Sequence, residues 1–467
     1  MTDLGAALAD LKAAVGPDGW TDDVERIAPH LTEWRGAWQG ETPLMLTPAS
    51  TDQVAAAVRV CARHGLAITP QGGNTGLVGG QIPQGEVLLS LKRMRAVRSV
   101  APLEDVMVLE AGLTLQEAQQ TAAAADRLFP LSLAAEGSAT VGGVISTNAG
   151  GTAVLRYGVA RDLVLGLEAV LADGSVFHGL KRLRKDNTGY DLKQLLIGAE
   201  GTLGIVTAAA LKLFPVMRSR ATAIVAIQTV QAALELLAMA KAETGGGVEA
   251  FELMNRQGLE LVLAHIPDAR APFEADPPWS VLIELVAGEA GAAERAMERL
   301  LGAALEQGLI VDAAVAQTQG QAAQLWRLRE DMSAAQKAAG GGWKHDVSLP
   351  LSEMSGFIAE TDAALAAAHP GVRLVTFGHL GDGNLHYNVV PPLGADPAVF
   401  AHRRHEGARI VHDQVAARAG SISAEHGLGV LKTEEALRYK DPVQIAAMRA
   451  VRDALDPRRI LNPRVLF

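Results

Sequence analysis

Residues 70–83 read PQGGNTGLVGGQIP, and residues 136–158 read EGSATVGGVISTNAGGTAVLRYG. A third glycine-containing stretch, LLIGAEGTLGIVT, covers residues 195–207. Clustered glycine costs conformational entropy, so its recurrence needs a reason, such as tight turns that approach a ligand closely. Short apolar runs lie between the clusters and predict strands joined by these turns. We therefore expect residues 1–215 to form one domain built from strands and glycine-rich loops.

The glycine spacing excludes two common nucleotide sites. No GxxxxGK[ST] motif occurs, and Gly73, Gly76 and Gly79 have the spacing GxxGxxG, which is not the Rossmann pattern. The unobstructed backbone N–H groups of this loop could instead hold anionic oxygens, such as those of a pyrophosphate. Structural turns between strands are the alternative explanation for any one cluster.

Composition narrows the class of protein further. The chain has 467 residues, 49% of them hydrophobic, and its 42 Lys and Arg against 52 Asp and Glu give a net charge of −10. That length predicts two or three domains, and the acidic balance without a basic block argues against nucleic acid or an anionic membrane as the main partner. The single cysteine, Cys61, excludes structural disulfides, thiolate zinc sites and a self-contained iron–sulfur cluster. Any bound metal must therefore be held by His, Asp or Glu.

The remainder of the chain divides into two further zones. Residues 216–395 alternate strand-like runs such as ATAIVAI and SVLIELVAG with helix-like runs, which predicts helices laid on a sheet. Residues 396–467 begin with a helical pattern and end in ILNPRVLF. No stretch predicts a transmembrane segment, and Asp3 and Asp10 stand where a secretory signal needs a basic flank and an apolar core, so we expect a soluble cytoplasmic protein.

A pair of histidines stands out in FGHLGDGNLHYNVV, residues 377–390. Asp-Gly between β-type runs predicts a hairpin, and a turn at Asp382–Gly383 would place His379 directly opposite His386, with Cβ atoms about 5 Å apart. Asn388 would point to the same face. A stacked surface pair of histidines is the alternative.

A second motif, SISAEHGLGVLK at residues 421–432, supplies Glu425 and His426 at the end of a strand-like run. Two histidines and one carboxylate form a familiar catalytic arrangement for zinc or a similar divalent ion. Adjacent residues of an extended chain point in opposite directions. One of Glu425 and His426 should therefore bind the metal, while the other has a different role, such as that of a base.

A third group of residues could bind a carboxylate. In LWRLREDMSAAQKAAGGGWKHDVSLP, residues 325–350, Arg329 and Ser333 are four apart on a predicted helix and so share a face, and Lys344 begins the next strand. A guanidinium, a hydroxyl and an ammonium that converge would form an anion clamp. A solvated helix face is the alternative for any one of these residues.

The glycine-rich stretches resemble the flavin-contacting segments of FAD-binding domains of the vanillyl-alcohol-oxidase type. The resemblance implies an α+β fold with such an FAD-binding domain, an α/β substrate (cap) domain on an antiparallel sheet, and a helical C-terminal segment that completes the active site and the FAD domain. Relatives with covalently bound flavin often have a histidine in the first loop, where this chain has Asn74, so the resemblance implies non-covalent FAD. The residues implied to bind FAD are Gly72, Gly73, Asn74, Thr75, Gly76, Leu77, Gly137, Gly142, Gly143, Asn148, Gly150, Gly151, Tyr157, Gly158, Glu200, Gly201, Ile205 and Asn462.

The motifs GHLGDGNLH and AEHGLG, with the closing NPRVLF, make the chain similar to the FAD-linked 2-hydroxyacid dehydrogenases over nearly its whole length. This resemblance implies that His379, His386 and Glu425 hold a divalent metal, usually zinc, and that His426 is the general base. It also implies that Arg329, Ser333, Lys344, Asn388 and His426 bind substrate. The reaction would be oxidation of a D-2-hydroxy acid to the 2-oxo acid by hydride transfer to flavin N5.

The two cations of the clamp favour a 2-hydroxy dicarboxylate such as 2-hydroxyglutarate over lactate. D-lactate or glycolate oxidation on the same scaffold, and more distantly a zinc hydrolase or a non-catalytic binding module, are the alternatives. The resemblance implies an electron-transfer flavoprotein or a quinone as the acceptor, and oxygen stays open for some relatives. The oligomeric state also stays open, a homodimer included.

Overall fold

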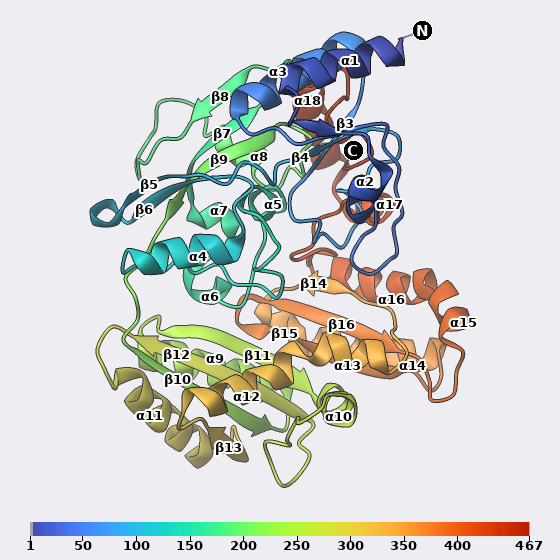
Figure 1. The fold of residues 1–467 in the computed structure, drawn as a ribbon. Helices are drawn as coiled ribbons and strands as arrows, with labels where there is room; N and C mark the ends of the chain where they lie inside the picture. The colour runs from blue at the N-terminus through green and yellow to red at the C-terminus, as the bar shows by residue number, and fades with distance from the viewer. Residues whose placement is uncertain (1–2, 467) are drawn as a thin grey trace. The chain divides into compact units, whose positions relative to one another are not determined.

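The chain folds into two compact units in the computed structural model, which describes residues 3–466 (Figure 1). Unit 1 contains Met1–Gly151, Tyr157–Val216 and Glu425–Phe467, and unit 2 contains Thr152–Arg156 and Met217–Ala424. The first boundary lies next to the one expected after residue 215. The boundary expected at 395–396 lies instead between Ala424 and Glu425, so the segment 396–467 is divided between the two units.

Unit 1 is built on two sheets. The first has four strands in the order β1-β2-β4-β3, of which β2, β4 and β3 run parallel, and the second has five antiparallel strands in the order β5-β6-β9-β7-β8. Cys61 is fully buried on helix α3, and burial raises the pKa of its thiol to about 12. The strands are β1 (Trp20–Thr21), β2 (Met45–Leu46), β3 (Ile68–Gln71), β4 (Val87–Ser90), β5 (Val97–Ala101), β6 (Val106–Glu110), β7 (Val164–Val170), β8 (Val176–Gly179) and β9 (Ile205–Lys212).

The helices of unit 1 begin and end at local signals in the sequence. Ser50 caps α3 by accepting a hydrogen bond from the N–H of Gln53, and Gly65 ends the helix in the left-handed conformation. The helices are α1 (Leu4–Val15), α2 (Val24–Leu31), α3 (Thr51–His64), η1 (Pro102–Glu104), α4 (Leu115–Ala124), α5 (Val141–Ser146), α7 (Ala160–Leu163), α8 (Lys193–Leu196), α17 (Thr433–Tyr439) and α18 (Pro442–Leu455); α6 (Val154–Tyr157) crosses the boundary between the units.

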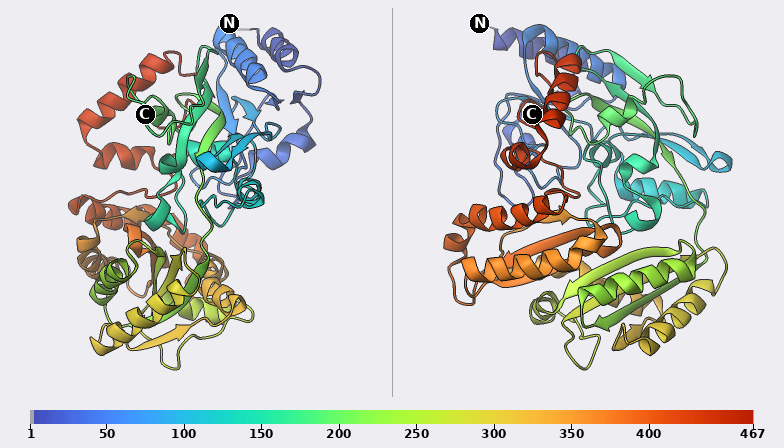
Figure 2. Two further views of the ribbon diagram at one scale, coloured as in Figure 1. Left: turned by 90° about the vertical axis from the view of Figure 1, so that its left-hand side faces the viewer. Right: turned by 180° about the vertical axis from the view of Figure 1, so that it is seen from behind.

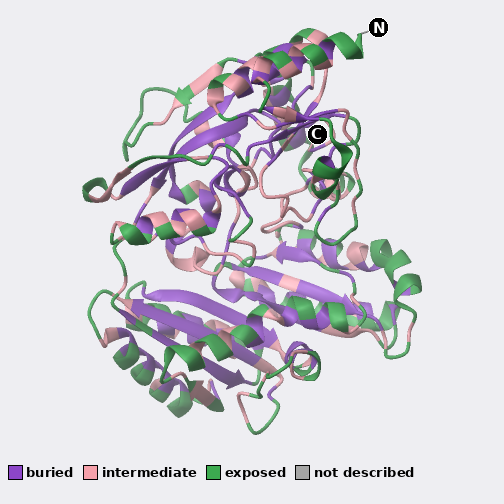
Figure 3. Ribbon diagram, in the orientation of Figure 1, coloured by how far each residue is buried: buried purple, intermediate pink, exposed green. Residues whose placement is uncertain are grey.

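Unit 2 is a seven-stranded antiparallel sheet in the order β13-β10-β12-β11-β15-β16-β14, covered by helices on both faces (Figures 1 and 2). Its central strands are buried along nearly their whole length (Figure 3), which explains why ATAIVAI and SVLIELVAG are continuous apolar runs and do not alternate. The strands are β10 (Ser219–Ile227), β11 (Val248–Asn255), β12 (Trp279–Ala287), β13 (Asp312–Val315), β14 (Asp346–Ser348), β15 (Arg373–His379) and β16 (Asn384–Val390).

The two faces of this sheet carry different helices. On one face Met254, Phe377 and Leu282 pack with residues of α10, α12 and α13 in a single buried cluster. On the other face Tyr387 packs its ring against Phe357 of α14. The helices are α9 (Val230–Thr244), α10 (Arg256–His265), α11 (Ala292–Glu306), α12 (Gln319–Glu330), α13 (Met332–Ala338), η2 (Leu351–Glu353), α14 (Met354–Ala368), η3 (Leu380–Asp382), α15 (Pro397–His402) and α16 (Arg404–Ala417).

This combination of helices with largely antiparallel sheets is the α+β class that the sequence predicts. Among residues 3–466, no helix is both long enough and apolar enough to cross a membrane.

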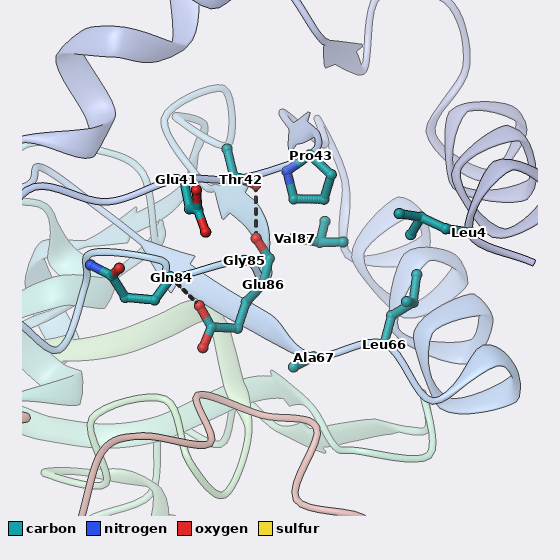
Figure 4. Close-up of a pocket in the computed structure, with 10 residues that line it drawn as sticks. All are labelled: Leu4, Glu41, Thr42, Pro43, Leu66, Ala67, Gln84, Gly85, Glu86 and Val87. Carbon is teal, nitrogen blue, oxygen red and sulfur yellow. Dashed lines mark hydrogen bonds between the residues drawn. The ribbon is translucent and has the colours of Figure 1, made fainter. Parts of the chain in front are cut away.

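A cavity of about 580 Å³ opens in unit 1 beside the start of β4 (Figure 4). Its polar lining includes Glu41, Gln84 and Glu86, and it contains no cationic side chain. Glu86 is already engaged by Arg464, 2.9 Å from its Oε1. None of the residues predicted to bind FAD, metal or substrate lines this cavity.

Candidate active site

The first glycine-rich loop, residues 72–81, leaves its main chain available for a ligand. Within the described part of the chain, none of the ten backbone N–H groups of these residues donates a hydrogen bond to another protein group. The residues from Gly72 to Leu77 are partly exposed, while Val78, Gly79 and Gly80 are buried. A row of unused N–H donors is the kind of nest that binds phosphate oxygens.

Close backbone packing explains the glycines of this loop. A Cβ added to Gly72 would lie 2.2 Å from Thr140 Oγ1, and one added to Gly73 would lie 1.9 Å from the carbonyl oxygen of Ser138. Both contacts are shorter than any real side chain tolerates, so the loop meets the second predicted FAD segment only because it has no side chains at these positions. Gly201, from the third segment, has φ of 74° and would place its Cβ 2.5 Å from Pro70. The three stretches therefore converge in unit 1.

Four residues predicted to bind FAD adopt the left-handed conformation without being glycine. Asn74 has φ of 59°, Asn148 of 50°, Glu200 of 51° and Asn462 of 42°. Such strained positions cluster where a ligand or an active site demands them. Their side chains hold the protein's own main chain: Asn74 donates to the carbonyl of Thr32, and Asn148 accepts from the N–H of Arg161.

Asn462 ties the C-terminal segment to this region. Its Nδ2 donates to the carbonyls of Gly80 and Glu200, at 2.9 and 2.8 Å. Tyr157 is buried with its ring 4.8 Å from that of Phe214. The other predicted FAD residues lie on the same three segments of unit 1, with Gly142 and Gly143 in helix α5, Gly150, Gly151 and Gly158 flanking α6, Gly137 before α5, Thr75 and Leu77 in the first loop, and Ile205 at the start of β9.

In unit 2, strands β15 and β16 form the predicted hairpin, but the predicted register is wrong. His386 pairs with Phe377, two residues before His379. The chain reverses through the 3₁₀ turn Leu380–Asp382 followed by Gly383 with φ of 86°, which consumes two more residues than an Asp-Gly turn would. Because the shift is even, both histidines keep the same face, and their ring centroids lie 5.6 Å apart on a diagonal.

A buried carboxylate lies near Nδ1 of each histidine. His379 pairs with Glu252 of the neighbouring strand β11, and their Nδ1 and Oε1 atoms are 2.7 Å apart. His386 pairs with Asp346 of β14, and Nδ1 lies 4.0 Å from Oδ1. Burial raises the pKa of Glu252, but the charges of His379 and Arg329 lower it more and hold it at about 2.

Glu425 joins the two histidines. One ligand atom each from His379, His386 and Glu425 lie within 4.8 Å of one another. Glu425 is the first residue beyond the boundary of unit 2 and directly follows Ala424, whose N–H donates to the carbonyl of Asp346 at 3.3 Å. The strand expected before Glu425 is absent from the structure. Only Ser421 forms a bridge, to Ser348, and residues 422–426 are irregular.

His426 is followed by the predicted Gly-x-Gly turn, and Glu200 holds that turn in unit 1. The two oxygens of Glu200 accept from the N–H groups of Leu428 and Gly429, at 2.9 and 2.8 Å. Gly427 has φ of 75°, and a Cβ there would lie 2.7 Å from Glu200 Oε1, so only glycine fits. Burial raises the pKa of Glu200 above its ordinary value, and the two N–H donors offset part of that rise.

The three residues of the predicted carboxylate clamp lie in different elements and differ in exposure. The expected single helix is divided at Asp331, so Arg329 lies in the last turn of α12 and Ser333 in the first turn of α13. The prediction that the two share a face of one helix is therefore wrong, and they differ in exposure, since Arg329 is buried and Ser333 is exposed. Lys344 is exposed and lies two residues before β14, so it does not begin that strand.

Asn388 lies on the predicted face, but part of its side chain has another role. Its Oδ1 accepts from the N–H of His345 at 3.2 Å, and the residue is buried. The Nδ2 group is the end that can contact a substrate. His412 is buried on α16 with its ring 5.8 Å from that of His345.

Two functional candidates were missed from the sequence, Glu252 and Asp346. Each is an acidic residue in a run of buried strand residues, VEAFELMN and DVS. A charge within such a run is a signal that could have been followed, because buried carboxylates need partners.

Comparison with known proteins identifies the family. Residues 42–179 match the family described as FAD binding domain, and residues 216–466 match FAD linked oxidases, C-terminal domain. The chain is 38% identical over 453 residues to the mitochondrial D-2-hydroxyglutarate dehydrogenase of Arabidopsis thaliana, covering 97% of this chain and 80% of that protein. It is 37% identical to the D-2-hydroxyglutarate dehydrogenase of Xanthomonas citri pv. viticola, covering 93% and 91%. The chain belongs to the FAD-linked D-2-hydroxyacid dehydrogenases.

Solved structures agree with the predicted fold. p-Cresol methylhydroxylase aligns with a TM-score of 0.77 over 99% of this chain and 97% of its own, at 16% identity. An alkyldihydroxyacetonephosphate synthase aligns with a TM-score of 0.73 over 98% and 84%, also at 16% identity. At such identity the likeness concerns the fold alone, and the predicted vanillyl-alcohol-oxidase type is confirmed.

The residues present in this dehydrogenase fit the cofactors that its family implies. The unused N–H groups of residues 72–81 suit the pyrophosphate of FAD. Two imidazoles and a carboxylate suit zinc or a similar divalent ion, and the carboxylate at Nδ1 of His379 leaves Nε2 as the nitrogen that can ligate.

We predict that His386→Ala removes the bound metal and most turnover but leaves the visible flavin spectrum unchanged, because the histidine lies in unit 2 and the FAD segments lie in unit 1. Metal analysis of the purified protein and an absorbance spectrum test this. His402→Ala, at an exposed position on α15, is the matched control and should change neither. Loss of FAD from the His386 variant would mean that the site is misassigned.

We predict that Glu200→Gln lowers kcat per bound flavin by about 10- to 100-fold, because a glutamine cannot accept from both N–H groups of the turn that follows His426. Steady-state kinetics and the flavin-to-protein ratio provide the measurement. Glu117→Gln, which alters a carboxylate in the capping box of α4, is the control. A variant whose kcat per bound flavin equals that of the wild type would contradict the positioning of His426 by Glu200.

Proposed function

We propose that this dehydrogenase oxidises D-2-hydroxyglutarate to 2-oxoglutarate, with non-covalently bound FAD and a divalent metal held by His379, His386 and Glu425. The observation that supports this most is the grouping of those three ligand atoms within 4.8 Å of one another. Glu252, which contacts His379, also accepts from Arg329 of α12. Relatives at 37% and 38% identity are named for the same substrate.

The chain's own residues would divide the chemistry between them. His426 would accept the proton of the 2-hydroxyl group, since a neutral imidazole is a suitable base near pH 7. The metal, when bound, supplies Lewis-acid stabilisation of negative charge at that oxygen, and FAD accepts the hydride from C2. Asn74 supports non-covalent FAD because its side-chain amide nitrogen is not nucleophilic. That nitrogen, Nδ2, donates to the carbonyl of Thr32.

The substrate's second carboxylate distinguishes it from lactate. Arg329 and Lys344, with the hydroxyl of Ser333 and the Nδ2 of Asn388, would hold that carboxylate. A monocarboxylate anchored at the metal has no need of these further cations, which favours the dicarboxylate.

Electrons must leave the reduced flavin for an external acceptor, because one buried cysteine cannot hold an iron–sulfur cluster. We propose an electron-transfer flavoprotein or a quinone. A relative from Saccharomyces cerevisiae, 34% identical over 94% of this chain and 89% of its own, is named a D-2-hydroxyglutarate–pyruvate transhydrogenase, so pyruvate belongs in any panel of acceptors.

Anaerobic mixing with single 2-hydroxy acids tests the proposed substrate. D-2-hydroxyglutarate should bleach the visible flavin absorbance fastest, ahead of D-lactate and glycolate, and L-2-hydroxyglutarate should leave it unchanged. Pre-treatment with a chelator should slow bleaching, and added Zn²⁺ should restore it. Faster bleaching by D-lactate or glycolate would replace the proposed substrate, and a colourless protein would overturn the flavin chemistry altogether.

We predict that Lys344→Met raises KM for D-2-hydroxyglutarate by about tenfold, since a charge-assisted hydrogen bond contributes about 1.5–3 kcal/mol, and leaves KM for D-lactate nearly unchanged. Lys241→Met, at an exposed lysine of α9, serves as the control. Equal changes for the two substrates, or none, would show that Lys344 does not bind the second carboxylate.

A further inference from the structure

The buried carboxylate of Glu252 connects two groups that the proposed function uses separately. Its Oε1 lies 2.7 Å from Nδ1 of His379, and its Oε2 accepts from Nε of Arg329, also at 2.7 Å. Glu252 is 1% exposed, so both contacts are shielded from water.

The contact with His379 determines which nitrogen can bind a metal. A carboxylate at Nδ1 keeps the proton on that nitrogen, which presents Nε2 as an unprotonated ligand and raises its basicity. The strand register supports the arrangement, because Glu252 of β11 is the direct partner of His379 on β15 and both side chains stand on one face. The orientation of the imidazole is therefore built into the sheet.

The contact with Arg329 determines which edge of the guanidinium can bind an anion. Glu252 occupies Nε, and the ring of Phe377 lies under the guanidinium carbon at 4.7 Å. A planar guanidinium held at one edge and on one face presents its two terminal nitrogens to a carboxylate in the bidentate manner. Phe377 in turn packs against His386, with ring centroids 5.1 Å apart, so the clamp and both histidines form one contiguous cluster.

We propose that Glu252 is a positioning residue that orients the metal ligand His379 and the substrate clamp Arg329 with a single carboxylate, an inference that rests on the proposed function. Neither contact requires Glu252 to touch substrate or metal. A purely structural ion pair needs one partner, whereas here each oxygen holds a different functional group. Removing the carboxylate should therefore weaken metal binding and disorder the clamp together.

Glu284 provides a matched control on the same face of the same sheet. It is also a buried glutamate, on the adjacent strand β12, and it binds Arg220, Thr222 and the indole N–H of Trp326 on α12. It has no contact with either histidine among the described residues. Glu284→Gln should thus reproduce the loss of a buried charge without disturbing the site.

The test measures Zn²⁺ affinity of the purified flavoprotein by competition with a chromophoric chelator. Glu252→Gln should weaken Zn²⁺ binding by about 10- to 100-fold and raise KM for D-2-hydroxyglutarate, with normal FAD content. Glu284→Gln should keep wild-type Zn²⁺ affinity. Arg329→Met, which leaves the Glu252–His379 contact in place, should raise KM and keep Zn²⁺ affinity.

If Glu252→Gln does not fold because Arg329 is left as an unpaired buried charge, the double variant Glu252→Gln/Arg329→Met removes that charge and should still bind Zn²⁺ weakly. Wild-type Zn²⁺ affinity in either Glu252 variant, or equal losses in the Glu252 and Glu284 variants, would overturn the positioning role and leave the proposed function intact. A wild-type protein that binds no Zn²⁺ would overturn both.

Discussion

Among the buried carboxylates of the sheet in unit 2, Glu252 is the one that holds both a predicted metal ligand and a residue of the predicted clamp. An isolated carboxylate in such surroundings is very costly to bury, and it persists only when its oxygens are paired. Glu252 meets that condition with His379 on one side and Arg329 on the other. The same requirement therefore brings a strand and a helix, 127 and 77 residues away in the chain, to fixed positions around the carboxylate. A stability requirement and an active-site geometry are met by the same contacts.

Unit 1 depends on a different constraint, the close approach of main chains. Its three glycine-rich stretches meet at distances that exclude a Cβ at Gly72 and Gly73, and their packing leaves a run of N–H donors without protein partners. Glu200, from the third of these stretches, also holds the C-terminal segment, because its carboxylate accepts from two N–H groups in the turn after His426. His426, the proposed base, thus belongs to the unit whose loops suit FAD, and His379 and His386 belong to the other unit.

Features set by local sequence could be predicted, and features set by distant pairing could not. Glycine spacing and the Asp-Gly hairpin are local, so the loops and the same-face histidines were found, and likeness to known motifs supplied the vanillyl-alcohol-oxidase type. The predicted register of the hairpin was wrong because the chain reverses through a 3₁₀ turn that ends at Gly383. That turn depends on the packing of Gly383 against the carbonyl of Leu349. Glu252 was missed because its partners are far away in the chain.

The net charge of −10 raises the question of how an acidic protein binds a dianion. Charges at the protein surface are screened over about 8 Å at physiological salt, so the local set of groups decides. Within that set Glu252 already neutralises Arg329, which makes the arginine a geometric recognition element with no net charge to contribute. In the proposed clamp, the attraction for the second carboxylate would then come from Lys344, and Arg329 would set its orientation. Two cations that look equivalent in the sequence would therefore have different physical roles, and a single buried carboxylate would separate them.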